Sequence, residues 1–207
     1  MKVYQATEIA SVKDPSKLPE TKFPEVAFAG RSNVGKSSLM NALLFRQKPL
    51  APISKRPGRT RSIDFYFISD KKVVFVDLPG YGYAAVPGEK RALWQQLVEG
   101  YISNRIQLAF VIILVDARRG LEQQEWELVG WLQRVKADWF IVFTKADRLK
   151  QNERKGLVKA VSDLGYRENV HYLLASAKTK MGIHELWELI DKKVDYKRAS
   201  LKLSWGF

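Results

Sequence analysis

Apolar residues along the chain alternate between short continuous runs and stripes with helical spacing. The short runs predict six strands, at residues 26–29, 63–68, 73–78, 109–116, 139–143 and 171–174. Apolar positions three and four residues apart predict helices at about residues 36–45, 90–102, 126–132, 153–164 and 183–194. Strands that alternate with helices predict an α/β fold, with a mostly parallel sheet and helices on both of its faces.

Two of the predicted strands are joined without an intervening helix. Residues 69–71 connect the runs at 63–68 and 73–78, which predicts an antiparallel hairpin. We therefore expect a six-stranded sheet with one antiparallel strand. Ligands of such sheets bind beyond the carboxyl ends of the strands, so chemically active residues that follow strands should converge on one edge.

The remaining segments set the expected domain boundaries. Residues 1–25 are polar and contain Pro15, Pro19 and Pro24, which predicts an extended lead-in packed on the domain with little regular structure. Residues 26–195 form the folded domain, and residues 196–207 form a short basic tail. Residues 46–62 contain several prolines, so we expect neither a helix nor a central strand there. A connection of this length is usually functional or mobile.

A phosphate-binding loop follows the first predicted strand. Gly30 and Gly35, followed by Lys36 and Ser37, match the pattern G-x-x-x-x-G-K-S. Glycine lets the backbone adopt left-handed angles and approach phosphate oxygens, while the next helix presents unpaired N–H groups to the anion. An ordinary glycine turn is the alternative, which the flanking strand and helix disfavour. The expected phosphate-binding residues are Gly30, Arg31, Ser32, Asn33, Val34, Gly35, Lys36, Ser37 and Ser38.

Two later segments favour guanine as the base. Asp147, in the segment 144–147 after a predicted strand, can accept hydrogen bonds from N1–H and the 2-amino group of guanine. Adenine offers neither donor, so the buried carboxylate would stay unpaired against it. The stem of Lys145 can lie along the base, and the segment 176–178 can supply a backbone N–H for the guanine O6. The expected base-binding residues are Thr144, Lys145, Asp147, Ser176, Ala177 and Lys178.

A further set of residues is expected to hold magnesium and sense the terminal phosphate. Asp77 ends the second hairpin strand, and the Gly80 amide follows it. We expect Ser37, Thr60 and Asp77 to place Mg²⁺, and Lys36, Thr60 and Gly80 to act in catalysis. Thr60 is chosen from its context, and Ser54 or Ser62 could replace it, in which case Thr60 is only a turn residue. Asp116, which ends another strand, is expected to shape its loop.

The chain carries a large positive charge. Thirty-five Lys and Arg residues against 22 Asp and Glu give a formal net charge of +13 and a pI near 9.8. This balance predicts a polyanionic partner, with RNA favoured over an anionic membrane or a merely solvated basic surface. The chain has no cysteine and no apolar run of membrane-spanning length. We therefore expect a cytoplasmic protein that does not enter membranes and acts as a monomer.

The same segments carry a family resemblance. Residues 28–38, 57–60, 77–84, 144–147 and 176–178 make the chain similar to the translation-factor-related GTPases of the EngB (YihA/YsxC) family, in the TRAFAC class. The similarity covers about residues 24–195, and its family-specific parts are the Arg31-Ser32-Asn33 form of the loop and the Gly80-Tyr81-Gly82-Tyr83 segment. Residue 144 is Thr where many GTPases carry Asn, a replacement that this family tolerates.

The resemblance implies a function. It implies a Ras-like P-loop GTPase that binds GTP and GDP with Mg²⁺ and acts as a switch in assembly of the large ribosomal subunit, through ribosomal RNA or a precursor particle. It also implies a link to cell division and septation. Tyr81 stands where Ras-like enzymes place a water-orienting Gln, so we expect slow intrinsic hydrolysis. Asn33 raises the further possibility of a K⁺ ion beside the phosphates, against a simple tight-turn role.

Two other functions compete with this interpretation. An RNA-binding assembly factor could hold GTP or GDP structurally and turn it over negligibly. An ATP-using kinase is the more distant alternative, because a phosphate loop alone does not select the base.

Overall fold

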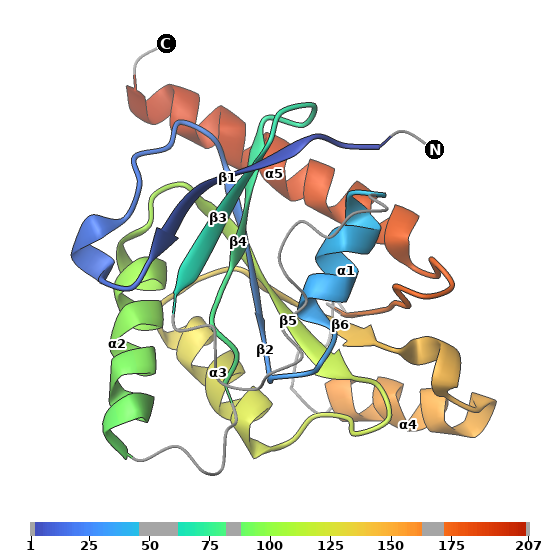
Figure 1. Cartoon of the computed structure of the whole chain (residues 1–207). Helices are drawn as coiled ribbons and strands as arrows, with labels where there is room; N and C mark the ends of the chain where they lie inside the picture. Colours follow the sequence, from blue (N-terminus) through green and yellow to red (C-terminus); the bar gives the residue numbers. More distant parts are fainter. Residues whose placement is uncertain (1–2, 46–61, 82–87, 163–171, 206–207) are drawn as a thin grey trace.

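One sheet organises the molecule. The computed structural model describes residues 3–45, 62–81, 88–162 and 172–205, and within them seven strands pair in the order β1-β3-β4-β2-β5-β6-β7 (Figure 1). The strands are β1 Ala6–Val12, β2 Glu25–Gly30, β3 Ile63–Ile68, β4 Val73–Asp77, β5 Leu108–Asp116, β6 Trp139–Thr144 and β7 Tyr172–Leu174. The α-helices are α1 Lys36–Leu43, α2 Gly88–Asn104, α3 Gln123–Arg134, α4 Gln151–Ser162 and α5 Ile183–Trp205.

The strand directions agree with the sequence-based prediction. Strand β3 runs antiparallel to both of its neighbours, β1 and β4, whereas β4, β2, β5, β6 and β7 are all parallel. The predicted α/β fold with one antiparallel strand is therefore confirmed. Because the remaining strands point the same way, β2, β4, β5 and β6 end at one edge of the sheet, at Gly30, Asp77, Asp116 and Thr144.

The predicted number of six strands is wrong, because part of the lead-in is a strand. β1 is the outermost strand on one side of the sheet, and among the described residues it pairs only with β3. Its register shifts between Glu8 and Ala10. This shift leaves Ile9 as an extra, 44% exposed residue. An edge strand with a bulge and largely exposed side chains lacks the regular alternation of apolar and polar residues that predicts a strand.

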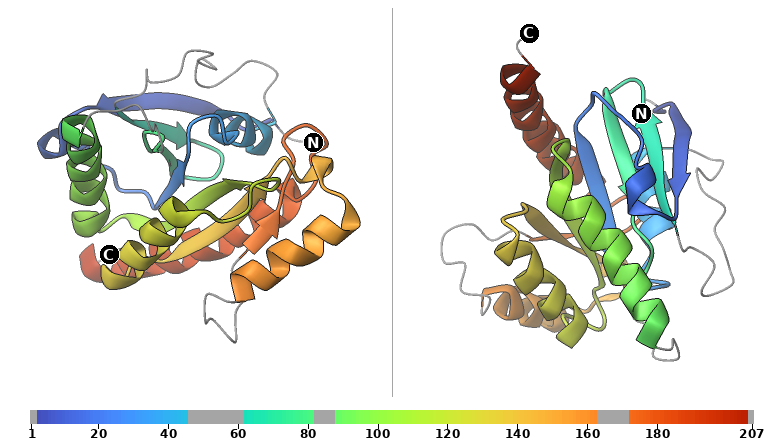
Figure 2. Two further views of the ribbon diagram at one scale, coloured as in Figure 1. Left: turned by 90° about the horizontal axis from the view of Figure 1, so that it is seen from below. Right: turned by 90° about the vertical axis from the view of Figure 1, so that its left-hand side faces the viewer.

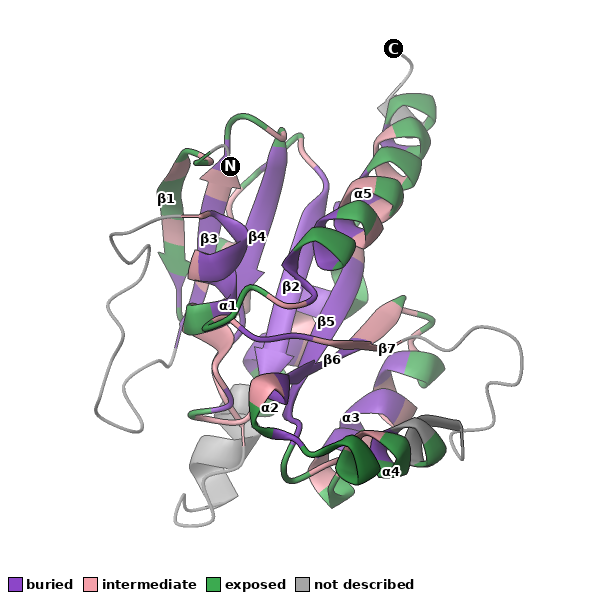
Figure 3. Cartoon of the chain, turned by 90° about the vertical axis from the view of Figure 1, so that its right-hand side faces the viewer, coloured by how far each residue is buried: buried purple, intermediate pink, exposed green. Residues whose placement is uncertain are grey.

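Each face of the sheet has its own core, as the successive side chains of a strand require. Ala27 and Ala29 of β2 contribute to the core beneath α2 and α3. Val26 and Phe28 contribute to the core beneath α1 and α5 on the other face. Figure 3 shows the central strands buried between these helical layers, and Figure 2 shows the layers from two further directions. The predicted helices on both faces are confirmed.

Helix α5 continues well past its predicted end near residue 194. It runs to Trp205, and the later buried residue Leu201 extends the apolar stripe that contains Val194. Arg198 donates a hydrogen bond of 3.0 Å from its guanidinium to the carbonyl of Lys71 in the β3–β4 turn. The predicted basic tail is thus part of α5 as far as residue 205. Residues 196–205 contain no Gly or Pro that would end the helix. Of the helices that the structure describes, none is long and apolar enough to span a membrane.

A buried ion pair lies at the end of the sheet where β2 begins, opposite the end where the parallel strands finish. Glu25 at the start of β2 is 0% exposed and accepts hydrogen bonds from Arg105 at 2.7 and 2.9 Å. Tyr101 and Thr21 donate to the same carboxylate at 2.9 and 2.6 Å. Arg105 also donates to the carbonyl of Pro19 at 2.6 Å. The network therefore joins the lead-in, β2 and the end of α2.

Candidate functional site

The phosphate-binding sequence lies between β2 and α1, at the edge where the parallel strands end. Gly35 has a φ of 106°, a left-handed conformation that other residues rarely adopt. Its carbonyl accepts a hydrogen bond of 2.8 Å from the N–H of Leu39, so the helix begins directly at the loop. Gly30 is closely surrounded, since an added β-carbon would lie 2.9 Å from Val34 Cγ1 and 3.1 Å from the Leu114 carbonyl oxygen. Strand, loop and helix follow one another as the sequence predicts.

Lys36 and Asp77 form a buried ion pair next to this loop. The ammonium of Lys36 contacts the Asp77 carboxylate, and their side chains are 11% and 6% exposed. Burial raises the pKa of Asp77, while the positive charge of Lys36 opposes that rise. The pair brings the predicted phosphate-binding lysine and a predicted magnesium residue together.

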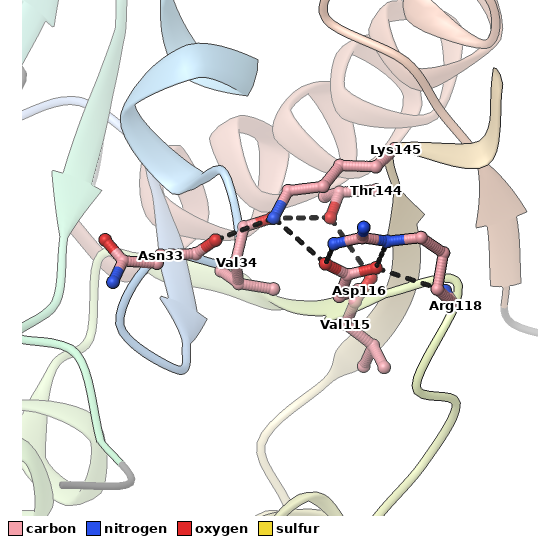
Figure 4. Close-up of polar contacts among 7 residues, drawn as sticks. All are labelled: Asn33, Val34, Val115, Asp116, Arg118, Thr144 and Lys145. Atoms are coloured by element: carbon pink, nitrogen blue, oxygen red, sulfur yellow. Dashed lines mark hydrogen bonds and ion pairs between the residues drawn. The ribbon is translucent and has the colours of Figure 1, made fainter. Parts of the chain in front are cut away.

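The last residue of β6 and the residue that follows it are bonded directly to the phosphate-binding loop (Figure 4). The hydroxyl of Thr144 donates a hydrogen bond of 2.6 Å to the carbonyl of Val34, and Thr144 is 4% exposed. The ammonium of Lys145 donates to the carbonyl of Asn33 at 2.8 Å. Lys145 itself has a φ of 57°, and its side chain extends to the loop (Figure 4). These contacts set the distance between the loop and the segment predicted to bind the base.

Asp116 supports this arrangement from the end of β5. Its carboxylate contacts Lys145 at 2.9 Å and accepts hydrogen bonds from the Arg118 guanidinium at 2.7 and 3.0 Å. Its burial acts to raise the pKa of Asp116, but the hydrogen bonds from Arg118 and Lys145 outweigh it and hold that pKa well below its usual range. The carboxylate thus stays ionised and fixes Lys145 over the loop (Figure 4).

The two segments predicted to bind guanine lie side by side. The N–H of Ala146 donates a hydrogen bond of 3.1 Å to the carbonyl of Ala175. A hydrogen bond from the Ser176 hydroxyl lowers the pKa of Asp147. Ser176 is 1% exposed, whereas Ala177 is half-buried and Lys178 is exposed. The ionised Asp147 carboxylate and the backbone around Ala177 therefore belong to one rim of the site.

The segment after β4 runs against the phosphate-binding loop. The N–H of Tyr81 donates to the carbonyl of Gly30 at 3.3 Å, and the N–H of Ser32 donates to the carbonyl of Tyr81 at 3.2 Å. A β-carbon on Gly80 would lie 2.9 Å from the Ser32 hydroxyl oxygen. The side chain of Tyr81 instead packs with the core beneath α2 and α3, where burial and the charge of Glu125 raise its pKa.

A cleft of about 250 Å³ lies beside the loop on its β5 side. Its walls come from the loop, the β5–α3 connection and the start of α3, and they include Arg31, Asn33, Asp116, Arg118, Glu122 and Lys145. Arg31 forms an ion pair with Glu122 across this cleft. Glu122, Glu125 and Arg118 were not predicted from the sequence as site residues. The spacing of Glu122 and Glu125 at the start of α3, which is that of a capping box, is the signal that could have found two of them.

Not every predicted site residue can be placed. The structure brings together residues 30–38, Asp77, Gly80, residues 144–147 and residues 176–178 along one edge of the sheet. Thr60, its competitor Ser54 and the motif at residues 57–60 lie outside the described residues, as does most of the loop at 46–62 and the segment 82–84. Ser62, the other competitor of Thr60, is 8% exposed and donates to Asp64 at 2.9 Å.

The donor set suits magnesium bound together with a phosphate. Within the described residues, no group of three or more His, Cys, Asp or Glu side chains could hold a metal ion. The oxygen donors next to the loop are the Asp77 carboxylate and the Ser37 hydroxyl at the start of α1. Mg²⁺ is commonly held by one or two protein oxygens, several waters and substrate phosphates rather than by an all-protein cage. Ser37 and Asp77 fit that kind of coordination.

Comparison with known proteins gives the family. The family described as "50S ribosome-binding GTPase" matches residues 25–145, and the family described as "Elongation factor Tu GTP binding domain" matches residues 98–195. A "Probable GTP-binding protein EngB" of Thermosipho africanus is 42% identical over 92% of this chain and 97% of its own length. A protein of the same name from Lachnospira eligens is 45% identical over 86% of this chain and 84% of its own length.

A solved structure of low sequence identity to this chain has the same fold. The crystal structure of a probable GTP-binding protein engB superposes with a TM-score of 0.66 and covers 83% of this chain and 99% of its own. Its sequence identity is 21%, so this similarity concerns the fold, which is that of Ras-like P-loop GTPases. With the curated relatives matching over nearly their whole length, the chain belongs to the EngB family of GTP-binding proteins.

Proposed function

We propose that this protein is a magnesium-dependent GTPase that hydrolyses GTP to GDP and phosphate and acts as a nucleotide-dependent switch. The observation that carries the proposal is the direct bonding of Thr144 and Lys145 to the carbonyls of Val34 and Asn33. These bonds hold a phosphate-binding loop and a base-binding segment in one rigid frame. A nucleotide that binds here must therefore fit the loop with its phosphates and the segment at residues 144–147 with its base.

The phosphates bind to the loop between β2 and α1. Backbone N–H groups of the loop other than those of Ser32 and Val34, which are bonded to protein carbonyls, meet the phosphate oxygens together with the amino end of α1. Lys36 moves from Asp77 to the β- and γ-phosphates. The closely surrounded Gly30 and the left-handed Gly35 keep the backbone available for this contact. Ser37, Asp77 and Thr60 would hold Mg²⁺, which would neutralise charge on the phosphate oxygens.

The base binds between the segments that follow β6 and β7. The Asp147 carboxylate accepts from N1–H and the 2-amino group of guanine, and the Ala177 N–H donates to O6. The lowered pKa of Asp147 keeps this acceptor ionised, and the ion pair with Asp116 holds the Lys145 stem beside the base. Ser176 and Lys178 complete the rim.

The protein responds to the γ-phosphate through Thr60 and Gly80. A water attacks the γ-phosphorus, the bond to the β-phosphate oxygen breaks, and GDP and phosphate leave. The side chain of Tyr81 has no amide group that could orient this water, as a Gln side chain does. It packs with the core on the α2 and α3 side of the sheet. Intrinsic turnover is therefore slow and increases when a partner docks.

The partner is the large ribosomal subunit or its precursor, recognised largely through ribosomal RNA in the cytoplasm. The net charge of +13 supports a polyanionic partner. The family whose description names 50S ribosome binding matches residues 25–145. Co-sedimentation with large and small subunits, in GDP or a non-hydrolysable GTP analogue, tests this step. Selective binding to the large subunit with the analogue supports the switch, and binding that ignores the nucleotide contradicts it.

One observation favours a second function. Because the Tyr81 side chain packs with the core and supplies no group that orients a water, an RNA-binding assembly factor that keeps GTP or GDP as a structural ligand would have the same site. Multiple-turnover phosphate release, with and without large subunits, separates the two functions. Release that rises with large subunits supports the GTPase. Release that stays negligible in both conditions supports the structural ligand.

A potassium ion beside the phosphates is a further part of the proposal. Asn33 is exposed in the loop with a φ of 64°, an angle that Asn tolerates. Hydrolysis measured in sodium and in potassium at equal ionic strength tests its role. Faster turnover in potassium that is lost in Asn33→Ala supports the ion, whereas equal rates assign Asn33 to the turn alone.

A further inference from the structure

The backbone after β4 is fastened to the phosphate-binding loop as a short parallel extension of the sheet. Arg31 and Tyr81 form an isolated parallel bridge. Its hydrogen bonds run from Tyr81 N–H to the Gly30 carbonyl at 3.3 Å and from Ser32 N–H to the Tyr81 carbonyl at 3.2 Å. Gly80, directly before this bridge, lies against Ser32, and a β-carbon on Gly80 would be only 3.2 Å from the Ser32 backbone nitrogen. The position of the Gly80 peptide therefore depends on the bridge.

Both side chains of the bridge are engaged by the first turn of α3. Arg31 forms an ion pair with Glu122, the residue that caps α3. The phenol of Tyr81 is buried beside Glu125, whose charge is among the causes that raise the tyrosine pKa. Glu125 is 2% exposed, so this carboxylate faces the protein interior.

The start of α3 holds these carboxylates in fixed places. Glu122 and Glu125 form a capping box in which each side chain accepts from the other residue's backbone N–H. The bond from Glu122 N–H to the Glu125 carboxylate is 3.0 Å long. Of the two carboxylates held by this turn, one is therefore paired with Arg31 of the loop, and the other lies beside the Tyr81 phenol of the segment after β4.

We propose that Glu122 and Glu125 are positioning residues for the γ-phosphate response, because they clamp Arg31 and Tyr81 and so hold Gly80 at the loop. This inference rests on the proposed GTPase function, in which Gly80 senses the γ-phosphate. The clamp of Arg31, Tyr81, Glu122 and Glu125 acts on the terminal phosphate through Gly80. GDP lacks that phosphate, so we expect the clamp to raise the affinity for a GTP analogue more than the affinity for GDP.

The test compares Glu122→Gln and Glu125→Gln with the wild-type protein. Glutamine keeps an oxygen that accepts the backbone N–H at both positions, and at the third helical position, which Glu125 occupies, it is a standard capping-box residue, so we expect α3 to retain its start. We expect the affinity for a non-hydrolysable GTP analogue, relative to that for GDP, to fall by about fivefold to tenfold, the size of one ordinary hydrogen bond. Glu127→Gln is the matched control, since Glu127 lies on the same helix, is exposed and accepts from Gln123 at 3.0 Å.

Amide hydrogen exchange provides a readout that needs no nucleotide. The N–H groups of Ser32 and Tyr81 are hydrogen-bonded in the bridge, so we expect their exchange to be faster in Glu122→Gln and Glu125→Gln at an unchanged melting temperature. Faster exchange with a reduced analogue-to-GDP ratio supports the clamp. Unchanged exchange, or equal losses for GDP and the analogue, overturns it. If the wild type binds no guanine nucleotide, the proposed function fails, and the exchange rates still decide whether the clamp exists.

Discussion

The hydroxyl of Thr144 donates a hydrogen bond of 2.6 Å to the backbone carbonyl of Val34, and the two residues are 110 positions apart in the chain. The same hydroxyl lies 3.2 Å from the carbonyl of Val115. This one side chain joins the ends of β5 and β6 to the phosphate-binding loop. A threonine can thus tie the segment at residues 144–147, which we propose to bind the base, to the loop.

Thr144→Val tests this tie. Valine keeps the shape but removes the donor, which leaves the buried Val34 carbonyl without this hydrogen bond. We expect the free energy of unfolding to fall by about 1–3 kcal/mol, together with weaker GDP binding. Urea denaturation and GDP titration measure the two effects. Thr144→Ser retains the hydroxyl and should stay near the wild type, and a Val variant that matches the wild type would contradict the role of the tie.

Asp147→Asn tests the choice of base. The amide cannot accept both guanine donors, so affinity for GDP should fall by about 100-fold, the cost of losing charged hydrogen bonds. Xanthine carries an oxygen where guanine carries its 2-amino group, so affinity for xanthosine diphosphate should rise. Competition against a fluorescent nucleotide measures both. Asp138→Asn is the control, because Asp138 precedes β6 at the opposite edge of the sheet and pairs with Lys193.

Gly80→Ala tests the contact between the switch segment and the loop. The new β-carbon would lie 2.9 Å from the Ser32 hydroxyl oxygen and 3.2 Å from its backbone nitrogen, and the backbone cannot move aside easily. We expect hydrolysis to fall by about 100-fold, as for other small misplacements of reacting groups, with GDP affinity retained. Gly156→Ala in α4 meets no atom within 4 Å and serves as the control. Normal turnover in Gly80→Ala would remove Gly80 from the mechanism.

Asp116→Asn should change how stability depends on pH. The pKa of Asp116 is lowered in the folded state, so its stabilisation is present above the unfolded pKa of about 3.9 and is lost as the pH falls further. At pH near 7 the variant should be less stable by about 1 kcal/mol, a modest value because Arg118 is exposed to solvent. The difference should shrink below pH about 4. Urea denaturation over a pH series measures it, and a pH-independent difference would contradict the assignment.

Arg105→Leu should destabilise the fold without touching the nucleotide site. It leaves the Glu25 carboxylate, which is 0% exposed, without its cation. Removing one partner of a buried pair typically costs about 3–5 kcal/mol. Adding Glu25→Leu should recover part of this loss, because it removes the uncompensated charge. Urea denaturation measures each variant, and Arg134→Leu, at an exposed position in α3, is the control.

Much of the architecture could be predicted from local sequence patterns. The apolar runs and helical stripes place the six strands β2 to β7 and all five helices, because a buried run and an amphipathic stripe are local signals. The spacing of Gly30, Gly35, Lys36 and Ser37 likewise predicts the strand, loop and helix around the phosphate-binding site. The edge strand β1 escaped prediction because its only partner, β3, lies more than fifty residues away and its bulge breaks the alternation.

The sequence by itself determined which chemical groups are available, namely a phosphate-binding loop, an acidic acceptor at Asp147, hydroxyl and carboxylate donors for magnesium, and a strongly basic chain. Only the tertiary structure decided how these groups are held. The contact of Lys145 with Asn33 and Asp116, the pairing of Arg31 with Glu122, and the packing of Tyr81 beside Glu125 join segments far apart in the chain. Parallel strands bring such segments to one edge, and no local pattern encodes which side chains then meet.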